Sequence, residues 1–164
     1  TWMNKNSKKI LSKDKDCLTH IVLTSVKEKI RFVSQDERES NVRAFLNYGH
    51  TLGHAIEAAM NYRNILHGQA ISIGMLFASM LSVEKNMLNI NDFNLIEDTL
   101  EKLNLPIEIP KRIKTRDIIK HIKFDKKKQD NRNRFVLLGK LGNCVINDKL
   151  KDDFLGKMIE HYRS

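Results

Sequence analysis

The sequence predicts a mainly α-helical domain with one small β-hairpin near residues 134–146. Apolar residues recur every three or four positions over long stretches, which is the period of an amphipathic helix. Strand-like patterning is confined to a single segment, and only Pro106 and Pro110 interrupt the chain. With 164 residues, of which 41% are hydrophobic, the chain has the length and composition of one ordinary globular domain.

Three helical stretches are expected in the first half of the chain. The first should run from Leu18 to Val33 and bury one apolar face, formed by Leu18, Ile21, Val22, Val26, Ile30 and Val33. A polar run at 34–41 separates it from a second stretch that reaches roughly Met60. The third, from about Gly68 to Lys85, is apolar nearly all round, so we expect it at the centre of the core.

The second half of the chain predicts shorter elements. A helix that Asn91 caps should reach about Leu103, and a second helix should run from Thr115 to about Phe124. A polar, irregular segment at 125–133 then leads into the hairpin. A last amphipathic helix is expected near Asp152 to Tyr162.

Charge and composition narrow the function classes. Lys and Arg total 29 against 20 for Asp and Glu, so the net charge of +9 favours an anionic partner. Seven glycines are present, but none falls into a GxGxxG or GxxxxGK[ST] loop, so the chain carries no nucleotide-binding signature. The alternative is a basic helical module that binds nucleic acid. Only the net charge supports it, because the sequence contains no known nucleic-acid-binding motif, so we expect no nucleic-acid partner.

Cysteine usage and hydropathy predict the compartment. Cys17 and Cys144 are too few for a disulfide scaffold, which favours a reducing, cytoplasmic setting. The N-terminal residues lack the apolar core of a secretory signal, and the longest uncharged stretch, 64–83, is too interrupted to span a bilayer. We therefore expect no membrane partner. The chain begins with Thr rather than Met, so we expect it to be a fragment.

The chemistry is concentrated around three of the six histidines. His50 and His54 are four residues apart, so on a helix both imidazoles project from one face, as a divalent metal or an anionic substrate requires. A catalytic zinc takes three protein ligands, and His67 is the third candidate by spacing. Without context such a pair is more often two hydrogen-bonded or exposed histidines, but the nearby glycines and Asn47 favour a binding site.

The segments that contain these histidines closely resemble the 3-dehydroquinate synthase family. The resemblance is carried by Arg43–Glu57 and Leu66–Met75, and supported by Ser25–Lys29, Asp36–Glu39, Asp125–Lys127 and Arg134–Leu138. It runs from about Leu18 onward. Residues 1–16 do not match clearly, so we expect them to form a flexible boundary before a helical domain at 17–164.

The resemblance implies a two-domain enzyme of which this chain is the C-terminal, metal- and substrate-binding half. NAD is then bound mainly by an N-terminal domain outside this chain, which itself supplies no cofactor-binding residues. The family is a lyase of the shikimate pathway to aromatic amino acids. It converts 3-deoxy-D-arabino-heptulosonate 7-phosphate to 3-dehydroquinate and phosphate by transient oxidation, elimination, re-reduction and ring closure. Zinc or cobalt and a homodimeric full-length enzyme are implied, and the fragment alone should be inactive. A sister sugar-phosphate cyclase is the alternative.

The resemblance also assigns roles to individual residues. His50 and His67 correspond to the metal ligands, with a third, glutamate ligand upstream of this chain, whereas His54 corresponds to a catalytic histidine that contacts substrate. Lys29, Arg43 and Asn47 correspond to positions that bind the substrate's carboxylate and phosphate, and Glu39 to an acidic residue that orients the site. Lys29 and Glu39 are thereby implied, with His54, as catalytic residues. The family also has a lysine at the substrate, for which Lys126 and Lys127 are both candidates.

Simpler interpretations of these residues stay open. Lys29 could be a solvated helix residue, Arg43 could pair with Glu39, and Asn47 could cap a helix. The family usually has His-Gly-Glu where this chain has His67-Gly68-Gln69. We expect altered surroundings of the metal rather than a lost ligand, because an amide oxygen can also accept the imidazole N–H and orient the ring.

Overall fold

A computed structural model describes residues 1–38, 42–128 and 134–164, without the side chains of 125–128. Eight α-helices, one 3-10 helix and one hairpin are found in these residues. Their bounds are α1 (Trp2–Lys5), α2 (Ser7–Leu11), α3 (Lys15–Gln35), η1 (Val42–Asn47), α4 (His50–Ala59), α5 (His67–Glu84), α6 (Ile90–Lys102), α7 (Thr115–Lys128), β1 (Phe135–Lys140), β2 (Asn143–Asn147) and α8 (Asp152–Arg163). The predicted mainly helical fold with a small hairpin is confirmed.

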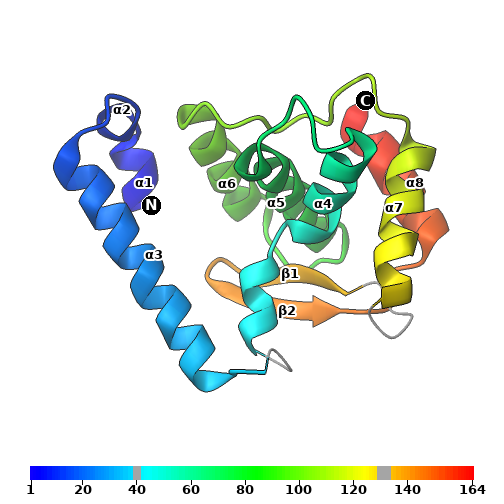
Figure 1. Ribbon diagram of the computed structural model, residues 1–164, viewed down its shortest axis with the longest axis horizontal. Helices are drawn as coiled ribbons and strands as arrows, with labels where there is room; N and C mark the ends of the chain where they lie inside the picture. Colours follow the sequence, from blue (N-terminus) through cyan, green and yellow to red (C-terminus); the bar gives the residue numbers. More distant parts are fainter. Residues whose placement is uncertain (39–41, 129–133) are drawn as a thin grey trace.

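The core is built around α5, as its all-round apolar sequence predicts. Ile73, Phe77 and Leu81 are fully buried, and α5 packs against α4, α6 and β1. α7 covers α4 and in turn packs against α8, which closes the domain (Figure 1). Despite its length, α5 does not qualify as a membrane span, and neither does any other helix in the described parts of the chain.

The hairpin extends the core through its first strand. β1 and β2 are antiparallel, with Val136 opposite Ile146 and Leu138 opposite Cys144. Phe135 to Leu138 are all buried. The Leu138 N–H donates to the buried Ser82 Oγ of α5 over 2.9 Å, which satisfies a polar group inside the core and fixes β1 on that helix.

Helix α3 forms where it was expected, but its predicted buried face is wrong. The exposed fractions of Val22 and Ile30 are 59% and 60%, and Leu18, Leu23 and Val26 are also exposed. The helix packs against α2 near its start and η1 beyond its end, and it lies at one side of the molecule in Figure 1. Apolar periodicity shows which residues share a face, but it does not show whether the partner of that face lies in the same chain.

Most of residues 1–16, expected as a flexible boundary, lie in helices. They form α1, α2 and the first residues of α3. Asn4 Nδ2 donates to Asp98 Oδ2 over 2.6 Å and thereby ties α1 to α6, and Asp14 Oδ1 caps α3 by accepting from the Cys17 N–H over 2.9 Å. Polar capping and side-chain contacts, which leave no apolar period in the sequence, explain why this order was not predicted.

Three other element limits differ from expectation, each for a local reason. Asn89, not Asn91, caps α6, because its Oδ1 accepts from the Asp92 N–H over 2.9 Å. The second helical stretch is split into η1 and α4, because Gly49 between them has a left-handed φ of 84°. α7 continues to Lys128 instead of ending at Phe124, so part of the segment expected to be irregular is helical.

Candidate metal and substrate site

The three histidines singled out in the sequence converge in the structure. His50 begins α4, His54 lies one turn later, and His67 begins α5. The ring centroids are 5.2 Å apart for His50 and His54, 5.5 Å for His50 and His67, and 5.7 Å for His54 and His67. One ring nitrogen from each lies within 4.8 Å of the corresponding atoms of the other two. Three imidazoles from two helices can therefore face a common ligand.

Close packing of α4 on α5 produces this convergence. Gly49 has positive φ, and a Cβ added there would lie 2.7 Å from the Met75 backbone nitrogen and 2.9 Å from the Ile71 carbonyl oxygen. A Cβ on Gly53 would lie 2.6 Å from Ile71 Cδ1. At Gly49 two of these contacts are with backbone and leave no room for a side chain, whereas at Gly53 the Ile71 side chain would have to shift. The glycines thus let the first turns of α4 approach α5 and place His50 and His54 beside His67.

Hydrogen bonding at Nδ1 defines how the rings of His50 and His67 are presented. His50 Nδ1 lies 3.3 Å from the Tyr48 carbonyl oxygen. His67 Nδ1 lies 3.1 and 3.2 Å from the two carboxylate oxygens of Glu57. With Nδ1 protonated and donating in each case, Nε2 of both rings keeps its lone pair for another ligand.

Electrostatics favour neutral imidazole at His50. Burial lowers the pKa of His50, and the neighbouring His54 and His67 lower that pKa further, while the hydrogen bond to the Tyr48 carbonyl acts in the opposite direction. Metal binding requires the neutral form of histidine. A set of neutral imidazole nitrogens suits zinc and cobalt, so the residues present fit a divalent metal of this type.

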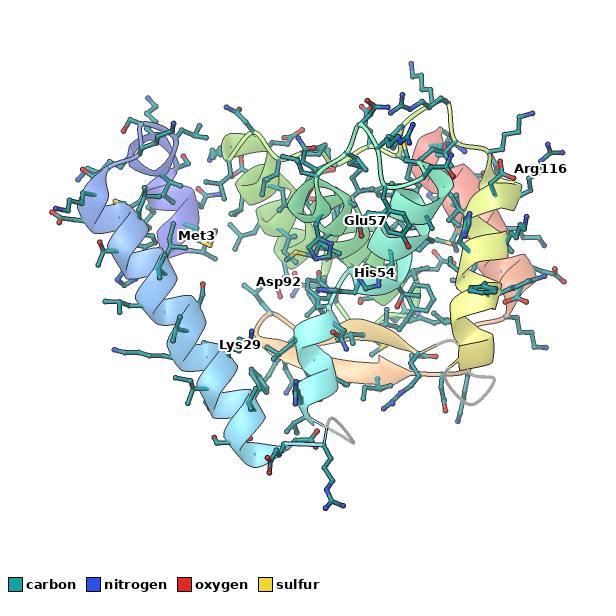
Figure 2. All side chains as sticks on the ribbon, viewed as in Figure 1. Met3, Lys29, His54, Glu57, Asp92 and Arg116 are labelled. Atoms are coloured by element: carbon teal, nitrogen blue, oxygen red, sulfur yellow. The ribbon has the colours of Figure 1, made fainter. Side chains whose placement is uncertain are left out.

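Glu57 is a site residue that the sequence prediction misses. It lies on α4 one turn beyond His54 (Figure 2), and its side chain is only 11% exposed. Positions 50, 54 and 57 follow the i, i+4, i+7 period of one helix face, so the same period that pairs the histidines could have identified this carboxylate.

Gln69 does not hydrogen-bond to the ring of His67, the predicted metal ligand, as we expected it to; it acts at the start of α5 instead. Its Oε1 accepts from the Leu66 N–H over 3.0 Å, at the start of α5. Leu66 carries no side-chain acceptor of its own, so Gln69 supplies the polar contact that closes this helix end. The carboxylate within hydrogen-bond distance of His67 Nδ1 is that of Glu57, whereas Gln69 acts at the start of the helix.

Replacing Gln69 with glutamate should therefore leave metal binding nearly unchanged. The new carboxylate can accept the same Leu66 N–H, and a negative charge in the first turn stabilises a helix by about 0.3–1 kcal/mol. We expect an unchanged Co²⁺ dissociation constant and a small rise in unfolding free energy. Titration calorimetry and chemical denaturation measure both; a tenfold tighter Co²⁺ complex would show that position 69 acts on the metal.

The predicted anion-binding residues are less completely assembled. Lys29 is exposed on the side of α3 that faces η1 and the hairpin (Figure 2). Arg43 in η1 donates from its backbone to Asp36 Oδ2 over 3.1 Å and from Nη1 to the Glu37 carbonyl oxygen over 2.7 Å. Asn47 is exposed at the end of η1, three residues before His50. The two Arg43 bonds hold this residue next to the C-terminal end of α3, and they do not place its guanidinium at the histidines.

Three predicted site residues cannot be placed by their side chains. Glu39 lies outside the described residues, so its pairing with Arg43 stays a prediction. Lys126 and Lys127 lie on the last turn of α7, where the structure describes the backbone but not the side chains. Arg134, which directly precedes β1, is hydrogen-bonded to α4: Thr51 Oγ1 donates to the Arg134 carbonyl oxygen over 3.0 Å.

Comparison with known proteins places the chain in a family. The family model described as "3-dehydroquinate synthase C-terminal" matches residues 1–128. A 3-dehydroquinate synthase of Thermodesulfovibrio yellowstonii is 41% identical over 154 residues, covering 94% of this chain and 43% of that protein. A 3-dehydroquinate synthase of Ruthia magnifica is 38% identical over 161 residues, covering 98% of this chain and 45% of that protein. The chain thus spans less than half the length of these relatives.

Solved structures show the same fold at lower identity. 2-epi-5-epi-valiolone synthase from Streptomyces hygroscopicus, with NAD⁺ and Zn²⁺ bound, has a TM-score of 0.83 and 16% identity, over 98% of this chain and 45% of that one. A 2-deoxy-scyllo-inosose synthase complexed with carbaglucose-6-phosphate, NAD⁺ and Co²⁺ has a TM-score of 0.76 and 22% identity, over 89% and 41%.

The structure therefore belongs to the fold class seen in parts of these synthase structures, a mainly helical domain with a two-stranded antiparallel hairpin. Within that class, the family match over most of the chain is specific. The chain belongs to the 3-dehydroquinate synthase C-terminal family.

Proposed function

We propose that this chain is the metal- and substrate-binding domain of a 3-dehydroquinate synthase. The reaction is conversion of 3-deoxy-D-arabino-heptulosonate 7-phosphate to 3-dehydroquinate and phosphate. The observation that carries the proposal is the convergence of His50, His54 and His67 with Nδ1 of two rings already bonded to acceptors. A protein that binds nucleic acid through its charge has no need of this arrangement.

In this proposal His50 and His67 hold a divalent zinc or cobalt ion through Nε2, and a glutamate outside this chain completes the ligands. A metal held there would supply Lewis-acid polarisation of the substrate hydroxyl, and NAD, the oxidant of that hydroxyl, would be held by the N-terminal domain. His54 is exposed and lies next to both ligand rings, so its ring nitrogen can accept or donate a proton at the bound substrate. His54 thus acts on protons, while the other two histidines position the metal.

The substrate's anionic groups account for the basic residues near the site. Lys29, Arg43, Asn47 and Lys126 or Lys127 are proposed to bind the phosphate and carboxylate, with Glu39 orienting them. Arg43 would exchange its bond to the Glu37 carbonyl for a phosphate or carboxylate oxygen. That exchange is favourable because a phosphate or carboxylate oxygen carries negative charge, which the neutral carbonyl oxygen lacks, and can accept two parallel bonds from the guanidinium. Fixing both anionic ends keeps the substrate oriented through oxidation and elimination.

The remainder of the full-length enzyme is proposed to cover α3. Leu18, Val22, Leu23, Val26 and Ile30 form an exposed apolar stripe along this helix. A stripe of this kind is unfavourable in water and typical of an interface. Because the relatives are more than twice as long, we assign the stripe to the N-terminal domain, which would also approach Lys29 on the same helix. A cytoplasmic homodimer of the full-length enzyme stays a prediction.

Phosphate release by the full-length protein tests the proposed activity. With heptulosonate phosphate, NAD and Zn²⁺ or Co²⁺ supplied, we expect stoichiometric phosphate and 3-dehydroquinate, and no turnover after chelation of the metal. Other phosphorylated six- and seven-carbon sugars serve as competing substrates. Turnover of one of these alone would assign the protein to a sister cyclase, and no turnover of any would contradict the enzymatic proposal.

A further inference from the structure

The Glu57 carboxylate pairs with the His67 ring. The carboxylate comes from α4, whereas the imidazole begins α5, so the contact bridges the two helices that build the site. The two partners differ in exposure: the His67 side chain is 57% exposed and the Glu57 side chain 11% exposed. The acid is therefore held in place by the protein interior, and the ring extends from it toward solvent.

We infer that Glu57 is the positioning residue for His67, holding its ring in the Nδ1–H tautomer with Nε2 directed at the metal. The inference rests on the proposed role of His67 as a ligand. Both carboxylate oxygens lie within hydrogen-bond distance of Nδ1, at 3.1 and 3.2 Å. A carboxylate acceptor fixes both the tautomer and the rotation of the ring, and it makes the opposite nitrogen a stronger donor to metal.

The location of His67 makes such a support necessary. It is the first residue of α5, and more than half of its side chain is exposed, so packing alone does not hold its ring in one orientation. Within the described residues, the Glu57 carboxylate is the polar group that bonds to the ring. Gln69, the residue nearest in sequence with a suitable amide, is bonded to the Leu66 N–H.

The alternative is that the Glu57–His67 pair has a purely structural role. In that case the pair merely ties α4 to α5, and its loss changes stability but not the metal affinity of the folded protein. Replacing a ligand-supporting group typically weakens metal binding by about 10- to 100-fold. Co²⁺ affinity and the Co²⁺ absorption spectrum respond to ligand orientation and not to global stability, so they distinguish the two roles.

The test compares Glu57→Ala and Glu57→Gln in the full-length protein, with Glu84→Ala as a matched control. Glu84 is exposed at the far end of α5. We expect Co²⁺ affinity to fall by about 10- to 100-fold in Glu57→Ala, with an altered visible spectrum. Glu57→Gln keeps an acceptor for Nδ1 and should recover much of the affinity, and Glu84→Ala should match wild type. Wild-type Co²⁺ affinity in folded Glu57→Ala would overturn the inference.

A second measurement needs neither metal nor a folded alanine variant. In metal-free wild-type protein, at a pH where the imidazole is neutral, nitrogen NMR of labelled histidine should show His67 as the Nδ1–H tautomer. In Glu57→Gln the same tautomer should persist, because the amide oxygen still accepts that proton. An Nε2–H tautomer in the wild type would overturn the inference. Absence of Co²⁺ binding in the wild type, with the Nδ1–H tautomer present, would contradict the proposed metal site instead.

Discussion

Replacing His67 with alanine is expected to remove the bound metal and lower kcat/KM of the full-length enzyme by about a thousandfold or more. The variant loses one of the two proposed histidine ligands and leaves the Glu57 carboxylate without its partner. Polarisation by a bound metal stabilises a transition state by several kcal/mol, and each 1.4 kcal/mol corresponds to a factor of ten in rate. Metal content after dialysis and steady-state phosphate release measure the two effects.

Matched histidine variants separate the proposed roles. His50→Ala should behave like His67→Ala. His54→Ala should keep most of the Co²⁺ affinity while losing activity, because the proposal assigns it proton transfer rather than a place among the ligands. His161→Ala is the control, since His161 is exposed on α8. Stoichiometric metal with wild-type turnover in His67→Ala would refute the ligand assignment, and metal loss in His54→Ala would make all three histidines ligands.

Local sequence patterns predicted the histidine cluster well because helical geometry links spacing to direction. His50 and His54 had to share a face once α4 formed, and the glycines beside them indicated close packing against another helix. The spacing of His67 predicted it as a third member, although its approach depends on how α5 crosses α4. The sequence prediction omits Glu57 although it lies on the same face at the i+7 position, because the search for ligands considered the histidines and did not extend their period to a carboxylate.

Tertiary arrangement outside the core was less predictable. The sequence indicates α5 as the central helix because an element apolar on all sides must be surrounded. The same reasoning failed for α3, whose apolar stripe includes the exposed Val22 and Ile30. Short polar caps also escaped prediction: Asn89 and Asp14 fix helix starts through single hydrogen bonds that leave only a weak trace in sequence.

Gly74→Ala is expected to be the most destabilising single-methyl change near the site. A Cβ on Gly74 would overlap the Gly49 carbonyl oxygen and lie 2.9 Å from the Gly49 carbonyl carbon and 3.0 Å from the Gly53 nitrogen. All three atoms belong to backbone, so α4 and α5 must move apart to admit the methyl group. Overpacking costs typically about 1–3 kcal/mol, and more where backbone shifts. The better helix propensity of alanine offsets up to about 1 kcal/mol.

We therefore expect a loss of about 2 kcal/mol in unfolding free energy, measured by chemical denaturation. Co²⁺ binding should weaken in parallel, because displacement of the first turn of α4 moves His50 away from His67. Gly156→Ala isolates the propensity contribution: Gly156 lies within α8, and a Cβ there meets nothing within 4 Å, so that variant should be more stable by up to about 1 kcal/mol. If Gly74→Ala were equally stabilising, the close crossing of α4 and α5 could not be what brings the histidines together.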